Sequence, residues 1–248
     1  MKTIGLVGGM SWESTAHYYR LLNEEVKARL GGLHSARCIV ASLDFATIEP
    51  LQRSNRWDEA GTVLNAAALG LERAGADLLL LCANTMHKVA DRMMSGVRIP
   101  LVHIADVTAE RVKKAGVRKV GLLGTRYTME EDFLRGRLAL LGLEVMVPDP
   151  EDRPEVNRVI FEELVLGRIE PRSRARYASV MEGLVRRGAQ GIIAGCTEIT
   201  LLVNQSDVSV PLFDTTAIHA LAAVERALEG ESTDSARRDP AKEKSLPA

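Results

Sequence analysis

The sequence repeats itself at three points, in the same order and at nearly constant spacing. Residues 4–9 return at 120–125 with an offset of 116, residues 74–81 return at 187–194 with an offset of 113, and residues 99–102 return at 210–213 with an offset of 111. Offsets this similar indicate two halves with one architecture. Two such halves are expected to face a shared cleft across a pseudo-twofold axis.

Each half alternates short apolar runs with amphipathic stretches. The apolar runs predict strands at 4–7, 37–43, 77–82, 99–104, 119–123, 144–147, 191–194 and 210–213. Helices are expected between them, among them 58–73 and a closing helix at 218–228 that packs back on the first half. Thr128 and Glu131 have the spacing of a capping box at the start of another helix.

This alternation is typical of parallel sheets with right-handed crossovers. We therefore expect an α/β fold of two pseudo-symmetric lobes, each a short parallel sheet flanked by helices, with a cleft between them. The predicted first lobe comprises 1–102 plus 214–230, and the second comprises 103–213. Residues 231–248 lack apolar periodicity and read as a disordered tail.

Composition excludes several classes of function. A net charge of −1 gives no electrostatic case for binding nucleic acid or an anionic membrane, and no apolar run is long enough to span a bilayer. Three cysteines without a C-x-x-C pair argue against a disulfide framework or a structural zinc site. No secretory signal is evident at the N-terminus, so reduced thiols in the cytoplasm are the simplest interpretation.

Four strand-to-helix junctions carry small or hydroxyl-bearing residues. They lie at 8–11, 82–85, 124–125 and 195–198. Ligands bind beyond the carboxyl ends of the strands in open α/β sheets. One junction of this kind could be a simple turn, but four at matched positions favour a ligand site.

Cys196 is the sharpest candidate for chemistry. It follows an apolar strand and a glycine, beside Thr197 and near an expected helix N-terminus. A helix N-terminus lowers the pKa of a thiol from its usual ~8.5, although the anionic Glu198 acts in the opposite sense. The alternative is a buried, inert cysteine.

Cys82 is the second catalytic candidate, but the repeat does not align it with Cys196. The offset of 113 places Cys196 opposite Ala83. Successive strand side chains point to opposite faces, so Cys82 and Ala83 cannot both face the cleft in the same way. A bulge or an early strand end could reverse their roles. Cys38, in the middle of a strand, is expected in the core.

Short polar side chains at the strand ends could hold a carboxylate, together with helix N-terminal N–H groups. These are Asn84, Thr85, Thr125 and Thr197. N-capping is the simpler role for them, and the two roles are compatible. His87 is expected to be a core or capping residue. No histidine has metal-ligand spacing, and the sequence has neither G-x-G-x-x-G nor a Walker motif, so neither metal nor nucleotide binding is predicted.

These residues resemble the aspartate/glutamate racemase family, whose members use no pyridoxal phosphate. The resemblance covers the chain to about residue 230. Its signatures are Gly8-Gly9-Met10, Asn84-Thr85-Met86-His87 and Gly195-Cys196-Thr197-Glu198-Ile199. The opening run 8–15 looks like the branch of broad-specificity amino-acid racemases.

The resemblance implies two pseudo-symmetric α/β lobes, a homodimer and an amino-acid substrate. It also implies paired cysteines that remove and return the α-proton on opposite faces, with no metal or organic cofactor. Such paired acid–base catalysis needs a pinned α-carboxylate. The positions implied to bind substrate are Met10, Gln52, Ala83, Asn84, Thr85, Thr125 and Thr197.

Two departures from the family pattern matter. The family order is Cys-Asn-Thr, whereas Ala83 precedes Asn84 here, so the first-lobe acid–base group is missing or displaced to Cys82. Aspartate-specific members carry an arginine after the second strand and a lysine in the second lobe. No cation clearly occupies either place here, although Gln52, Arg53 and Arg168 are close in sequence. A broader or different side-chain preference is expected.

The leading prediction is a cofactor-independent amino-acid racemase with asymmetric acid–base groups. One alternative is a single-cysteine relative that resembles the decarboxylases of the same superfamily. Another is an amino-acid-binding protein that has kept the carboxylate site but performs no reaction.

Overall fold

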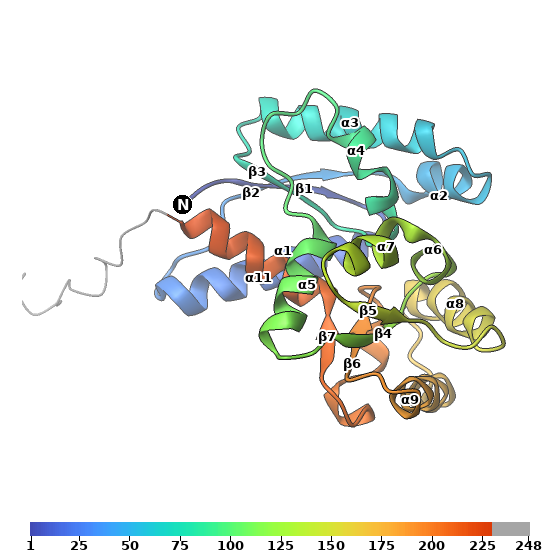
Figure 1. The fold of residues 1–248 in the computed structure, drawn as a ribbon. Coiled ribbons are helices and arrows are strands. Elements are labelled where there is room, and N and C mark those ends of the chain that lie inside the picture. Colours follow the sequence, from blue (N-terminus) through green and yellow to red (C-terminus); the bar gives the residue numbers. More distant parts are fainter. Residues whose placement is uncertain (230–248) are drawn as a thin grey trace, which may run out of the picture.

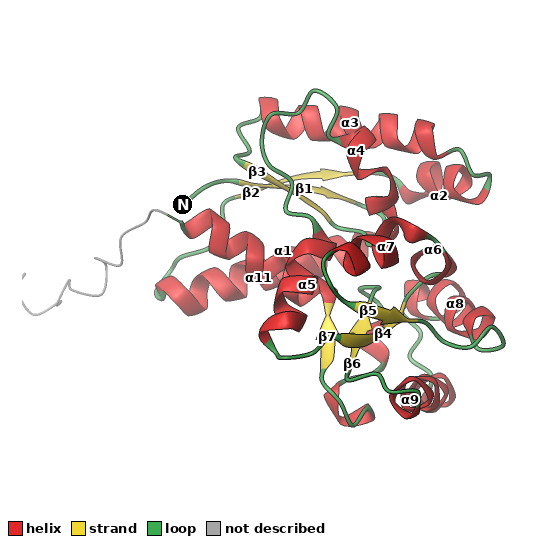
Figure 2. Ribbon diagram, in the orientation of Figure 1, coloured by secondary structure: helices red, strands yellow, loops and turns green. Residues whose placement is uncertain are grey.

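A computed structural model of the protein describes residues 1–229, and the tail predicted at 231–248 lies outside the described residues. The chain forms two parallel sheets, each flanked by helices (Figures 1 and 2). The prediction of an α/β fold with two lobes is confirmed.

The first sheet has the strand order β2-β1-β3. Its strands are β1 (Ile4–Gly8), β2 (Cys38–Ser42) and β3 (Leu78–Leu81). The accompanying helices are α1 (Trp12–Leu30), α2 (Phe45–Arg53), α3 (Trp57–Arg73), the 3₁₀ turn η1 (Thr85–Val89) and α4 (Ala90–Met93).

The strand predicted at 99–104 is wrong. A single parallel bridge joins Leu101 to Leu79, and the chain then enters α5 (Ile104–Lys114). The His103 side chain accepts a hydrogen bond from the Ala105 N–H and so caps that helix.

The second sheet has the order β5-β4-β6-β7. Its strands are β4 (Lys119–Leu123), β5 (Glu144–Met146), β6 (Gly191–Ala194) and β7 (Leu212–Asp214). Its helices are α6 (Arg126–Glu130), α7 (Asp132–Leu140), α8 (Arg153–Glu162), η2 (Leu164–Leu166), α9 (Pro171–Arg186), α10 (Ile199–Leu202) and η3 (Gln205–Asp207). The predicted Thr128–Glu131 capping box is wrong, because Thr125 caps α6 and its side chain accepts from the Thr128 N–H.

The internal repeat is confirmed by the register of the two sheets. Ile4 pairs with Leu78 in the first sheet, and the equivalent positions Val120 and Gly191 pair in the second. The Leu79–Leu101 bridge corresponds in the same way to the pairing of Ile192 with Leu212. The first sheet therefore has a single β-bridge where the second sheet has its fourth strand, β7.

Glycines at equivalent positions of β1 and β4 have the same role in packing. A Cβ added to Gly5 would lie 3.3 Å from Leu71 Cβ of α3, and one added to Gly121 would lie 3.2 Å from Leu184 Cβ of α9. Both glycines let a covering helix approach the central strand closely.

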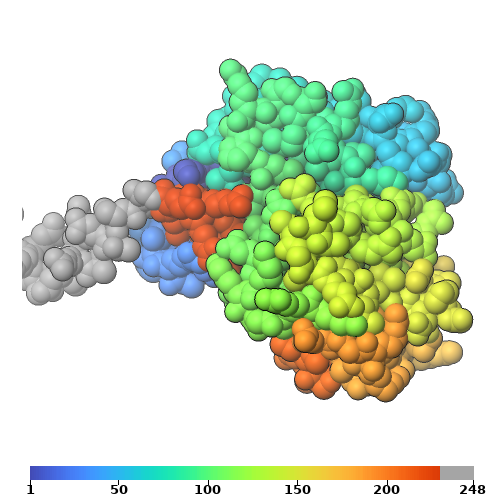
Figure 3. Space-filling model, in the orientation of Figure 1, coloured from blue at the N-terminus to red at the C-terminus, as the bar shows by residue number. Residues whose placement is uncertain are grey.

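The closing helix α11 (Thr215–Leu228) packs on the first lobe although it follows the second sheet. Ala220, Ala223 and Val224 share an apolar cluster with Ile4 and Leu6. In Figure 3 the red α11 lies beside the blue α1, while the yellow and orange residues of the second lobe lie below the first. No helix within residues 1–229 is both long enough and apolar enough to cross a membrane.

Candidate active site

Residues from all four predicted strand-to-helix junctions line one cavity between the lobes. Its empty volume is about 510 Å³, including the open mouth. The lining residues are Met10, Ser11, Ser14, Phe45, Gln52, Ala83, Asn84, Thr85, Met86, Thr125, Ile160, Phe161, Val165, Gly195, Cys196, Thr197 and Glu198. All seven positions predicted to bind substrate are among them, as is Cys196.

Cys82 lies away from this cavity. Leu78, Leu80 and Cys82 point into the apolar cluster beneath α1 and α11, where Cys82 is fully buried. Ala83 belongs instead to the cluster on the other face of the sheet and lines the cavity. The regular alternation of the strand continues through Cys82, whose N–H donates to the Val7 carbonyl at 2.9 Å. Cys82 therefore does not lie where the catalytic role considered for it would require, on the wall of the cavity.

Cys196 lies on the cavity wall with its thiol donating to Glu198 Oε2 at 2.9 Å. Burial, followed by the negative charge of Glu198, raises the pKa of this thiol well above its usual value. The expectation of a pKa lowered by a helix N-terminus is therefore wrong. The helix that follows, α10, has four residues and so contributes only a small dipole. At neutral pH the resting thiol is protonated.

Glu198 connects the two lobes through its second carboxylate oxygen. Ser11 Oγ, from the N-terminus of α1, donates to Glu198 Oε1 at 2.9 Å. The two oxygens of one carboxylate thus accept from a thiol of the second lobe and a hydroxyl of the first. Sequence analysis counted Glu198 as a local influence on Cys196 and gave no signal for the contact with Ser11.

The amide of Asn84 is held in one orientation at the cavity wall. Its Nδ2 donates to Thr215 Oγ1 at 3.1 Å, and Thr215 in turn donates its one hydroxyl proton to the Ala194 carbonyl at 2.8 Å. That chain fixes the orientation of the amide, because Thr215 can only accept from Asn84. Asn84 Oδ1 is buried without a hydrogen-bond partner.

Threonine hydroxyls from both lobes meet at the cavity. Thr85 Oγ1 and Thr125 Oγ1 are 3.0 Å apart, and Thr216 donates to Thr197 Oγ1 at 3.2 Å. Thr125 also caps α6, so capping and a position on the cavity wall coincide.

His87 is held as a neutral core histidine, as expected from the sequence. Its Nε2 accepts from the Ile104 N–H at 3.3 Å, so Nδ1 carries the proton and donates to the Ala83 carbonyl at 2.9 Å. Burial holds its pKa well below the usual value. His87 therefore fixes the backbone of Ala83.

Apolar side chains form a further part of the cavity lining, here called the apolar wall, and sequence analysis missed it. It consists of Phe45, Met86, Ile160, Phe161 and Val165. Three of these lie on α8 and around η2, which follow an edge strand rather than one of the four junctions. Within residues 1–229, no group of three or more His, Cys, Asp or Glu residues is arranged to hold a metal ion.

Comparison with known proteins identifies relatives of this chain. The family model described as Asp/Glu/Hydantoin racemase matches residues 7–223. The chain is 24% identical over 175 residues to the broad specificity amino-acid racemase RacX of Bacillus subtilis, an alignment that covers 71% of this chain and 75% of RacX.

Two crystal structures share the fold over nearly the whole chain. A candidate Asp/Glu racemase from Yersinia pestis is 57% identical with a TM-score of 0.88, and the alignment covers 92% of this chain and 100% of that one. PH1733, an aspartate racemase homologue from Pyrococcus horikoshii OT3, is 39% identical with a TM-score of 0.81 and the same coverage.

Proposed function

The chain belongs to the Asp/Glu/hydantoin racemase family, and on that premise we propose that it is an amino-acid racemase in which Cys196 moves the α-proton. One observation carries the proposal. Of the three cysteines, all within the described residues, Cys196 alone lines the cavity, and its proton is directed at a carboxylate.

The polar groups of the cavity suggest how an amino acid would bind. The α-carboxylate accepts from the hydroxyls of Thr85, Thr125 and Thr197, which can rotate their protons toward it. The α-ammonium donates to Asn84 Oδ1, which has no other donor. This assignment differs from the role as a carboxylate donor expected of Asn84, because one N–H of its amide donates to Thr215 and its Oδ1 is the atom without a partner.

Proton transfer then runs through Cys196 and Glu198. Glu198 Oε2 takes the thiol proton, and the resulting thiolate removes the hydrogen from the α-carbon. The electron pair of the broken C–H bond moves into the carboxylate, giving an enediolate that the threonine hydroxyls stabilise. The reverse sequence returns a proton to the same face and restores the starting thiol.

The opposite face lacks a comparable proton carrier. Ala83 occupies the position that the repeat matches with Cys196, and its methyl group cannot transfer a proton. Reprotonation on that face falls to water. We therefore expect exchange of the α-proton to exceed racemisation.

The Cys196 thiol is protonated at rest, and the cavity has Ala83 at the position equivalent to it. Both features also favour a second candidate reaction, decarboxylation followed by one-sided protonation of the enediolate. In that case deuterium from heavy water enters the decarboxylated product, and no amino acid exchanges its α-proton. A binding protein without activity would be stabilised by amino acids with no exchange at all.

The test compares Cys196→Ala with Cys82→Ala. We expect α-proton exchange in heavy water to fall by at least about 100-fold in Cys196→Ala, the usual scale of a lost acid–base group. Cys82→Ala should keep its exchange rate and serves as the matched control. Retained exchange in Cys196→Ala, in a protein whose thermal unfolding is unchanged, contradicts the proposal.

We further propose a homodimer located in the cytoplasm. Free thiols at Cys38, Cys82 and Cys196 support a reducing compartment. The dimer rests on the family relationship, and sedimentation of the full chain tests it.

A further inference from the structure

The charge of the cavity wall constrains the substrate side chain. Among residues 1–229, Glu198 is the one charged side chain that lines this cavity, and no lysine, arginine or histidine does so. The threonine hydroxyls and Asn84 are assigned to the α-carboxylate and the α-ammonium. A second carboxylate on the substrate would therefore share the cavity with Glu198 and find no cation. An unpaired buried carboxylate is strongly disfavoured.

Two arginines lie near the cavity but outside its lining. Arg53 and Arg126 line an adjoining hollow that shares Gln52 and Phe161 with the cavity. The Arg126 guanidinium stacks 4.8 Å from the centre of the Tyr127 ring and donates to its hydroxyl at 3.1 Å. The Arg53 side chain is 76% exposed and lies 3.7 Å from Glu49.

The apolar wall provides a hydrophobic contact surface for the substrate side chain and carries no charged group. Phe45 comes from α2, Met86 from η1, Ile160 and Phe161 from α8, and Val165 from η2. Gln52 also lines the cavity, and one of the two N–H groups of its Nε2 donates to Met86 Sδ at 2.8 Å.

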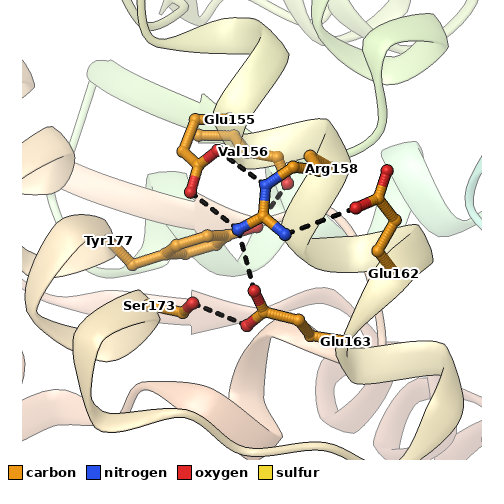
Figure 4. A network of polar contacts seen from close by, with 7 residues as sticks. All are labelled: Glu155, Val156, Arg158, Glu162, Glu163, Ser173 and Tyr177. Atoms are coloured by element: carbon orange, nitrogen blue, oxygen red, sulfur yellow. Dashed lines mark hydrogen bonds and ion pairs between the residues drawn. The ribbon is translucent and has the colours of Figure 1, made fainter.

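A network of polar contacts joins α8, which carries Ile160 and Phe161 of this wall, to α9 (Figure 4). Arg158 donates to both carboxylate oxygens of Glu155 at 2.8 Å and to Glu163 at 2.8 Å, and Ser173 of α9 donates to Glu163 at 2.6 Å. The buried Tyr177 hydroxyl donates to the Val156 carbonyl at 2.6 Å. Helix α8 is thus tied to α9 through Tyr177, and the following residue Glu163 is tied to α9 through Ser173.

We propose that the substrate is an amino acid with an uncharged, mainly apolar side chain, which lies against Phe45, Phe161 and Val165. This inference rests on the proposed function and specifies its substrate class. Aspartate and glutamate are poor substrates because the cavity pairs neither of their side-chain carboxylates.

The test measures α-proton exchange in heavy water for leucine, methionine, aspartate and glutamate, each as both enantiomers. For the faster enantiomer of each amino acid, we expect kcat/KM for leucine or methionine to exceed that for aspartate and glutamate by at least about tenfold, the scale on which apolar pockets discriminate. Faster exchange of aspartate or glutamate overturns the inference, and it implicates Arg53 or Arg126, while leaving the proposed function intact.

Absence of exchange with all four amino acids contradicts the proposed function, and thermal stabilisation then tests the substrate class alone. Stabilisation by leucine or methionine and not by aspartate or glutamate supports the inference. Stabilisation by the acidic pair, or by neither pair, overturns it.

A matched pair of variants tests the electrostatic reason. Gln52→Lys adds a cation to the cavity wall, and Gln52→Met is its neutral control of similar length. We expect the ratio of glutamate to leucine exchange to rise at least about tenfold in Gln52→Lys relative to Gln52→Met. An equal ratio in two folded variants contradicts the argument from charge.

Discussion

Replacing Ala83 with cysteine should supply the proton carrier that the first lobe lacks. Ala83 already lines the cavity, and its exposed fraction is 9%, so the change adds one sulfur atom at the wall. Cys82 stays on the other face of the sheet. We expect Ala83→Cys to racemise substrate faster than the wild type while exchange on the Cys196 face changes little.

The structure indicates the size of this effect. A positioned acid or base contributes about 10²–10⁴-fold to a rate. The new thiol would lack a carboxylate partner, because both oxygens of Glu198 are occupied by Cys196 and Ser11. Burial keeps such a thiol protonated, just as burial raises the pKa of Cys38 to about 11. It should therefore act well as an acid and poorly as a base.

We accordingly expect racemisation to rise by about 100-fold, or ~2.7 kcal/mol of barrier, starting from the enantiomer that Cys196 deprotonates. The rise should be smaller from the other enantiomer. Polarimetry or chiral chromatography at pH 8 measures both directions. Ala83→Ser is the control, since its hydroxyl has nearly the same size without the acidity. An increase no greater than that of Ala83→Ser would refute the assignment of Ala83 to the opposite face.

Three further predictions concern Glu198, the buried histidines and the first strand-to-helix turn. Glu198→Gln should lower the pKa of Cys196, because it removes a negative charge, and the pH dependence of thiol alkylation measures this shift. The same variant should reduce α-proton exchange by at least about 100-fold, because the thiol loses its proton acceptor. Unchanged exchange would exclude Glu198 as the acceptor. Burial lowers the pKa of His219 to about 3 and that of His103 to about 4, whereas the unfolded chain protonates both near 6.5, so stability should fall as pH drops below about 6.5. Between pH 7 and pH 5 the two histidines together should lower the free energy of unfolding, measured with urea, by roughly 4 kcal/mol. A His219→Gln variant whose stability depends on pH as strongly as that of the wild type would contradict this. Gly9→Ala should lower the free energy of unfolding by more than about 2 kcal/mol, because Gly9 has φ +88° and its added Cβ would overlap the Leu43 backbone. The control is Gly32→Ala, where φ is positive but the space is open, and it should lower the free energy of urea unfolding by about 1 kcal/mol. Equal losses in the two variants would contradict the overlap.

The parts of the site that sequence analysis predicted are those governed by local geometry. The repeat offsets anticipated that Ala83 and Cys196 lie at equivalent strand ends, and the registers of β1 with β3 and of β4 with β6 agree with them. Strand alternation then decides between Ala83 and Cys82. The sequence left that choice open because it does not reveal whether β3 contains a bulge.

The parts that it missed depend on contacts between distant segments. The hydrogen bond from Ser11 to Glu198 joins residues 187 positions apart. The apolar wall comes from α8 and η2, whose approach to the cavity is set by packing rather than by a motif. The pKa of Cys196 was predicted in the wrong direction because the sequence suggested a helix dipole, whereas burial and Glu198 dominate.

The stereochemical fate of deuterium tests the central claim most directly. The wild-type enzyme, incubated in heavy water with each enantiomer of leucine, should incorporate α-deuterium with retention at least about 100-fold faster than it racemises, and from one enantiomer only. Incorporation from both enantiomers at rates equal to racemisation would show two working acid–base groups, and would contradict a site in which Cys196 acts on one face alone.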